Sequence, residues 1–141
     1  MIRIEDAPKN SIRTNSGIYI NVFKPTPEMI YIEDIAHALS LMCRYNGHTP
    51  VFYSVAEHSV LCVNQIKNPV NKLAMLLHDA SEAFIGDIIR PLKHLLPAYE
   101  EIEHNMMFAI SEKFNFQYQF DNEIREVDDL LLKYELEHFM Y

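Results

Sequence analysis

The chain has 141 residues, of which 49% are hydrophobic and 23% are charged, and its formal net charge is −8. This length suits one domain, and the hydrophobic share supports a packed core, which excludes a mostly disordered chain. The negative charge argues against a nucleic-acid polymer as a partner, because an extended phosphate backbone binds a basic face. It still allows one small phosphorylated ligand, held locally by a metal ion and a few basic side chains.

Two features bear on where the protein works. No signal peptide stands at the start, and no apolar run approaches the roughly 18 residues needed to cross a bilayer. The two cysteines, Cys43 and Cys62, lie in apolar stretches at helical spacing, so we expect reduced, buried thiols. A cytoplasmic protein with no membrane partner is therefore predicted.

The first 26 residues are the least regular part of the chain. Asn15-Ser16-Gly17 is typical of a turn, and residues 18–23 are rich in β-branched and aromatic side chains. A short strand or hairpin is predicted here, and it ends at Pro25 and Pro27.

Helical periodicity begins near Ile32, and five helices are predicted. The first runs to Asn46-Gly47, and Ser54 with Glu57 has the spacing of a capping box that starts the second. The third starts at Asn68-Pro69 and runs to Gly86. The second, fourth and fifth helices are expected over about residues 55–66, 98–113 and 122–141.

Five helices with short loops predict an all-α, bundle-like fold with a small N-terminal β-hairpin. We expect residues 1–141 to form a single domain, with no repeat and no linker. The last helix has no cap before Tyr141, so the sequence leaves open whether the natural chain continues.

Polar groups interrupt the third predicted helix. His78 and Asp79 are adjacent in an apolar run, and burying both is expensive unless something binds them. Glu82 follows His78 by one helical turn, and Asp87 comes just after Gly86.

Two other predicted helices carry similar groups. His58 lies beside apolar residues in the second helix, and Asp128-Asp129 stands between Val127 and Leu130 in the fifth. Two neutral imidazoles and two carboxylates would balance a divalent cation. Such a mixed nitrogen and oxygen set suits Zn, Co, Ni, Mn or Fe better than Ca.

The order of His58, then His78-Asp79, then Asp128 resembles the H…HD…D pattern of the HD-domain metal-dependent phosphohydrolases. The strings over residues 32–40, 43–48 and 53–59, and HDASEAF-x-GD followed by Pro91 and Lys93, resemble its phage and prophage branch. That branch is similar to the bacterial 5′-deoxynucleotidases and the phage dATP triphosphohydrolase. The resemblance covers roughly residues 14–138 and implies an HD-domain helical bundle.

The resemblance also implies residue roles. His58, His78, Asp79 and Asp128 would bind the metal; Glu82 would activate the attacking water; Asp87 would protonate or orient the leaving oxygen; Arg44 and Lys93 would hold phosphate; Tyr45 would pack on the sugar. Asp128 is preferred over Asp129 because the ligand aspartate of this branch stands seven residues before a helical glutamate, here Glu135. His48, which follows Gly47, is a further candidate for substrate contact.

The implied activity is hydrolysis of the 5′ phosphate ester of nucleotides or deoxynucleotides. Either a monophosphate gives nucleoside and phosphate, or a dNTP gives nucleoside and triphosphate, and the sequence leaves both open. The cofactor would be a divalent transition metal, with Mg assisting on the substrate phosphates. Relatives are commonly homo-oligomers, so a dimer or larger assembly is expected in a bacterium or a phage-infected host. The alternatives are an HD phosphodiesterase for cyclic or signalling nucleotides and a non-catalytic, metal-stabilised binding protein.

Overall fold

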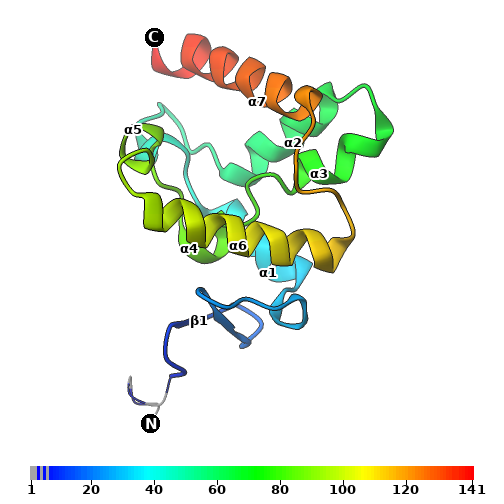
Figure 1. Cartoon of the computed structure of the whole chain (residues 1–141). Helices are drawn as coiled ribbons and strands as arrows, with labels where there is room; N and C mark the ends of the chain where they lie inside the picture. The colour runs from blue at the N-terminus through cyan, green and yellow to red at the C-terminus, as the bar shows by residue number, and fades with distance from the viewer. Residues whose placement is uncertain (1–2, 4, 6) are drawn as a thin grey trace.

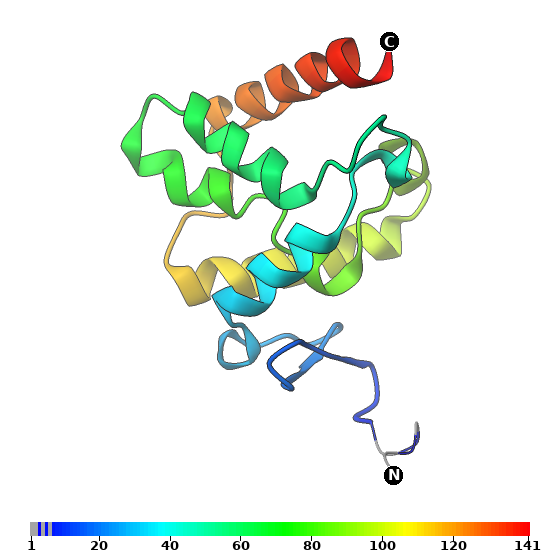
Figure 2. The ribbon, with the colours of Figure 1, turned by 180° about the vertical axis from the view of Figure 1, so that it is seen from behind.

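A computed structural model describes Arg3, Glu5 and residues 7–141. In this part of the chain, seven α-helices follow a two-stranded antiparallel hairpin, which confirms the predicted all-α class with a small N-terminal hairpin. Figures 1 and 2 show the hairpin at one end of the molecule and the last helix at the other. None of the described helices has the length and hydropathy to span a bilayer.

The hairpin pairs β1 (Ser11–Arg13) with β2 (Tyr19–Asn21), with Ile12 opposite Ile20. The predicted turn is confirmed, because Gly17 closes it with a φ of 90°, a backbone conformation that favours glycine. The fully buried Ile20 attaches the hairpin to the core of the domain.

The first helix, α1 (Ile32–Leu41), begins with a carboxylate that binds the hairpin. Asp34 is buried and accepts hydrogen bonds from Ser16 N (2.8 Å) and Ser16 Oγ (2.6 Å). Burial raises the pKa of Asp34, but the hydrogen bonds from Ser16 and Thr14 outweigh it, so the pKa lies below its usual value.

The cap predicted for α2 (Val55–Gln65) is confirmed, since Ser54 Oγ accepts from Glu57 N at 3.0 Å. A 3₁₀ turn (Pro69–Asn71), capped by the side chain of Asn68, then leads into α3 (Lys72–Leu76).

The prediction of one helix from Pro69 to Gly86 is wrong. The helix α3 ends at Leu76, and α4 (Glu82–Ile85) is a separate short helix. In a continuous helix, Met75 O would accept from the amide of Asp79. Here it accepts from His78 N (3.3 Å) and contacts His78 Nδ1 (2.7 Å), so tight turns replace the helix where His78 and Asp79 stand.

The remaining helices are α5 (Arg90–Lys93), α6 (Pro97–Phe114) and α7 (Asn122–Glu135), followed by a π-helical turn (Leu136–Met140). The two long helices confirm the fourth and fifth predicted ones, whereas α5 lies between the third and fourth predicted helices, where no helix was predicted. Asp121 Oδ1 caps α7 by accepting from Ile124 N at 3.3 Å.

Two apolar clusters form the core. One joins the hairpin, α1, α4 and α6, and it contains Ile20, Leu39, Phe84, Met106 and Ile110. The other joins α2, α3 and α7, and it contains Cys62, Met75, Ile124, Val127 and Leu131. Met75 belongs to the second cluster and Leu77 to the first, so the turns at His78 and Asp79 lead the chain from one cluster to the other.

Replacing Asp34 with alanine should lower the free energy of unfolding by about 2 kcal/mol at neutral pH, because two hydrogen bonds to a charged group are lost. Glu33→Ala, at the exposed neighbouring position, is the matched control and should change it little. The difference should be present above the usual pKa of 3.8 and shrink as the pH falls toward the lower pKa of folded Asp34. Urea titrations at several pH values measure it, and an equal loss in both variants would contradict it.

Candidate metal centre

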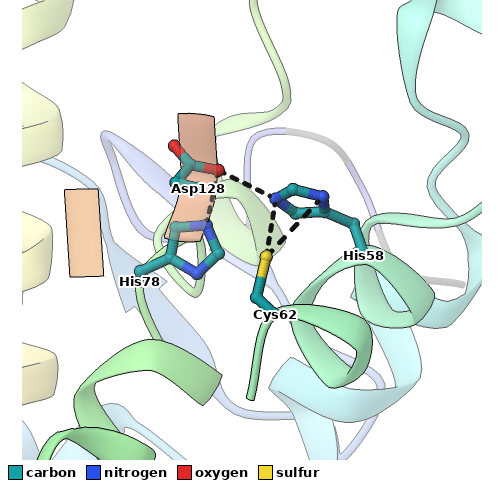
Figure 3. Close-up of side chains that lie close together, drawn as sticks. All are labelled: His58, Cys62, His78 and Asp128. Carbon is teal, nitrogen blue, oxygen red and sulfur yellow. Dashed lines mark hydrogen bonds and ion pairs between the residues drawn. The ribbon is translucent and has the colours of Figure 1, made fainter. Parts of the chain in front are cut away.

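Four predicted ligands converge from three segments of the chain. His58 projects from the middle of α2, His78 and Asp79 from the turns after α3, and Asp128 from α7. Figure 3 shows the two imidazoles and Asp128 facing one another.

The distances suit one shared ion. Asp128 Oδ1 lies 3.0 Å from His58 Nε2 and 3.4 Å from His78 Nε2. Asp79 Oδ2 lies 3.2 Å from His78 Nε2 and 3.8 Å from His58 Nε2. Ligand atoms held about 2.1 Å from a transition metal stand roughly 3.0–3.5 Å from one another. The four side chains therefore need only small shifts to surround a cation.

The imidazole of His78 is oriented as a metal ligand. Its Nδ1 lies 2.7 Å from Met75 O, and because a carbonyl only accepts, Nδ1 carries the hydrogen. The buried Nε2 points into the cluster, toward the carboxylates of Asp79 and Asp128. In the neutral ring with its hydrogen on Nδ1, Nε2 carries a lone pair beside these two oxygens, so the residues present fit a metal.

The imidazole of His58 is held in the same way by a carboxylate. Its Nδ1 is hydrogen-bonded to Glu135 Oε1, and both side chains are fully buried. Its Nε2 is thereby turned toward Asp79 and Asp128. A carboxylate that holds the far nitrogen of a histidine is the usual support of a histidine metal ligand.

Asp128 and Asp129 occupy different faces of α7. Asp128 contacts both imidazoles, whereas Asp129 is exposed. The helical twist thus puts only the first of the two predicted candidates next to the other ligands.

Cys62 is a neighbour of the site that sequence reasoning missed. The predicted buried, unpaired thiol is present, but its Sγ lies 3.5 Å from His58 Nε2 and 3.9 Å from His58 Nδ1. Each of four side chains offers one possible ligand atom, and these four atoms lie within 4.8 Å of one another: His58, Cys62, His78 and Asp128. Asp79 Oδ2 also lies near both imidazoles, so Cys62 and Asp79 are both neighbours of the proposed ligands His58 and His78. The available signal was the four-residue spacing from His58 on one helix.

The imidazoles and carboxylates of the site shift one another's pKa values. Burial lowers the pKa of His58, but hydrogen bonds to Asp128, Cys62 and Glu135 outweigh it and raise the pKa to about 11. Burial also lowers the pKa of His78, and the charges of Asp79 and Asp128 raise it well above the usual value. Burial raises the pKa of Asp128, yet the hydrogen bonds from His58 and His78 hold it far below its usual value. Two imidazolium charges oppose two carboxylates, and a divalent ion carries the same charge.

A cavity of about 640 Å³ opens beside this centre, within the size range of small-molecule sites. Asp79 and Asp128 form part of its wall. The six other predicted site residues all line it: Arg44, Tyr45, His48, Glu82, Asp87 and Lys93. The wall also contains apolar side chains: Ile88, Ile89, Pro91, Leu132 and Met140.

Glu82 and Asp87 form an acidic pair in the cavity wall. Burial, with the charges of Asp79 and Asp87, raises the pKa of Glu82 well above its usual value, and Glu82 Oε2 is buried without a hydrogen-bond partner. Burial and the charge of Asp79 likewise raise the pKa of Asp87, against smaller opposite effects that include a hydrogen bond with Glu82. Carboxyl groups with raised pKa values suit proton transfer near neutral pH.

The two predicted phosphate-binding cations already have acidic partners. Arg44 Nε and Nη2 donate to Glu135 Oε2 at 3.0 and 2.8 Å, which leaves Nη1 toward the site, 4.0 Å from Asp79 Oδ2. Lys93 Nζ lies 2.6 Å from Glu103. Sequence reasoning used Glu135 only as a spacing mark and did not identify Glu103.

Comparisons with known proteins place the chain among close relatives. No family model matches it. The chain is 39% identical over 121 residues to YfdR, an uncharacterized protein of Escherichia coli (strain K12), with 86% of this chain and 67% of YfdR aligned. The chain belongs to the YfdR family. A second uncharacterized member, RCAP_rcc00048 of Rhodobacter capsulatus, is 40% identical over 112 residues. That alignment covers 72% of this chain and 57% of the relative, so the chain spans less than two thirds of this family member.

Asp128→Ala should weaken the binding of Zn²⁺ or Co²⁺ at least about 100-fold, because it removes one of the four proposed ligands of the ion. Asp129→Ala, one position further along the same helix, should leave the affinity unchanged. Calorimetric titration of metal-free protein measures both, with circular dichroism to verify the fold. Equal affinities in the two variants would show that Asp128 does not bind the ion.

Proposed function

We propose that the chain is a metal-dependent phosphohydrolase of small nucleotides, of the HD-domain kind that its H…HD…D pattern resembles. One observation carries this proposal. Two imidazoles and two carboxylates converge at one side of a cavity whose wall also contains an acidic pair and two basic side chains.

The bound ion would be a divalent transition metal such as Zn, Co, Ni, Mn or Fe, held by His58, His78, Asp79 and Asp128. When bound, it supplies Lewis-acid chemistry, since it neutralises phosphoryl oxygens and makes water easier to deprotonate. The carboxylates of Asp79 and Asp128 balance its charge.

Glu82 is the proton acceptor in this proposal. Burial and the charges of Asp79 and Asp87 raise the pKa of Glu82, and a cation bound beside Asp79 would offset those charges. With the ion bound, Glu82 would be a carboxylate that receives the proton from a water in the cavity. The water oxygen forms a new bond to phosphorus, and the bond between phosphorus and the 5′ oxygen breaks. Asp87, whose pKa is raised by burial and by the charge of Asp79, would supply the proton that the leaving oxygen needs.

The rest of the wall suits a nucleotide. Arg44 Nη1 and Lys93 supply positive charge for phosphate oxygens. The guanidinium of Arg44 is a planar donor, and the ammonium of Lys93 is a compact point charge. Ile88, Ile89 and Leu132 offer apolar surface to the sugar and base. Both a monophosphate and a dNTP remain substrates in this proposal, because the same ester bond is cleaved in each.

Glu82→Gln should reduce turnover by about 100- to 10,000-fold while metal binding is retained, because the amide cannot accept the proton from water. Glu126→Gln, at an exposed position of α7, is the control and should leave turnover unchanged. The protein is loaded with Mn²⁺, Co²⁺, Ni²⁺ or Zn²⁺ and given dNMPs, NMPs, dNTPs and cyclic nucleotides, and products are separated by chromatography.

The outcomes of this assay are distinct. Turnover of mono- or triphosphates that depends on Glu82 supports the proposal and names the substrate. No turnover with any metal would reject an enzyme, and turnover of cyclic nucleotides alone would favour a phosphodiesterase.

A further inference from the structure

One buried carboxylate, that of Glu135, receives hydrogen bonds from four side chains. Its Oε2 accepts from Arg44 Nε and Nη2 at 3.0 and 2.8 Å and from Tyr45 Oη at 2.7 Å. Its Oε1 accepts from Tyr53 Oη at 2.9 Å and is hydrogen-bonded to His58 Nδ1. Glu135 is fully buried at the end of α7, so these contacts join that helix to α2 and to the segment before it.

The residues bound to Oε2 belong to a strained loop. Tyr45, Asn46 and Gly47 have successive φ values of 54°, 51° and 78°. The left-handed region is unfavourable for a residue other than glycine, and a bulky residue such as Tyr45 is rarely found there. The surrounding contacts must hold the loop in this shape. The hydrogen bond from the Tyr45 hydroxyl to Glu135 is one such contact.

The strained loop is also a wall of the cavity. Arg44, Tyr45, Asn46 and His48 all line it. Because Arg44 is fixed through Nε and Nη2, its Nη1 is the nitrogen left to face the site, near Asp79.

We propose that Glu135 is a positioning residue that couples the metal ligand His58, through Oε1, to the cavity loop Arg44–His48, through Oε2. The Oε1 half fixes the ring so that Nε2 faces the cluster. The Oε2 half fixes the loop that meets the substrate. Metal affinity and substrate affinity therefore both depend on this one carboxylate.

The proposal predicts what an isosteric change does. Glu135→Gln keeps the size of the side chain but turns one oxygen into an NH₂ group, which donates and cannot accept. Whichever half becomes NH₂ then meets a group that only donates: the guanidinium of Arg44 at one half, or the Nδ1–H of metal-bound His58 at the other. Buried donors left without an acceptor destabilise the arrangement.

Three further variants separate the two halves. Tyr53→Phe removes a donor from Oε1, the half shared with His58, and Tyr45→Phe removes one from Oε2, the half shared with Arg44. Glu137→Gln, at an exposed position two residues along the chain, is the matched control. Metal affinity is measured by titrating metal-free protein with Co²⁺ or Zn²⁺. KM and kcat are measured with the nucleotide that is hydrolysed best, at a saturating metal concentration.

Glu135→Gln should weaken metal binding about 10- to 100-fold, as loss of a support of a metal ligand does, and should also raise KM. Tyr53→Phe should weaken metal binding about 2- to 10-fold with KM unchanged. Tyr45→Phe should raise KM with metal affinity unchanged, and Glu137→Gln should change neither. A general loss of stability would move both quantities together in both tyrosine variants.

Metal affinity of folded Glu135→Gln equal to that of the wild type would overturn the inference. Equal effects of Tyr45→Phe and Tyr53→Phe on metal affinity would also overturn the inference. If Glu135→Gln does not fold, the two tyrosine variants test the inference by themselves. The inference rests on the proposed metal-dependent function only for its KM values. Absence of nucleotide hydrolysis would reject that function, and the metal titrations, which need no turnover, would still decide whether Glu135 positions His58.

Discussion

The charged cluster between the two apolar cores constrains the rest of the structure, because charges removed from water must be neutralised by one another or by an ion. His58 and Glu135 are fully buried, and Asp79 and Asp128 are only partly exposed. These groups come from α2, from the turns after α3 and from α7, so the helices that enclose the second core also bring the charges together. Packing and electrostatics therefore select the same arrangement of these helices.

The broken helix follows from this constraint. A continuous helix from Pro69 to Gly86 would carry His78 and Asp79 along one axis and keep Met75 O in a backbone hydrogen bond. In the observed turns Met75 O accepts from both the backbone N and the Nδ1 of His78, and the second contact orients the ring. They also move the chain from the second core at Met75 to the first at Leu77. The helix propensity of this segment is therefore outweighed by the need of two buried polar side chains for partners.

The wall of the cavity next to the cluster combines the acidic, basic and apolar side chains expected of a site for a phosphorylated small molecule. The carboxylates of Asp79 and Asp128 lie beside the imidazoles, and the cavity wall also contains basic groups and aliphatic side chains. Arg44 and Lys93 are each paired with a glutamate, so their positions are set before any ligand binds. Such pre-set side chains reduce the conformational cost of binding.

The sequence by itself determined the helical class, the N-terminal hairpin, and the starts of α2 and α7, because periodicity and caps such as Ser54 act over a few neighbouring residues. It also named the side chains that surround the centre, through motif resemblance and the cost of burying them. Tertiary structure alone decided the helix break at His78, the thiol of Cys62 beside His58, and the contacts of Glu135. The physical reason is distance along the chain: Arg44 and Glu135 are 91 residues apart, and only the packing of two cores brings such residues together.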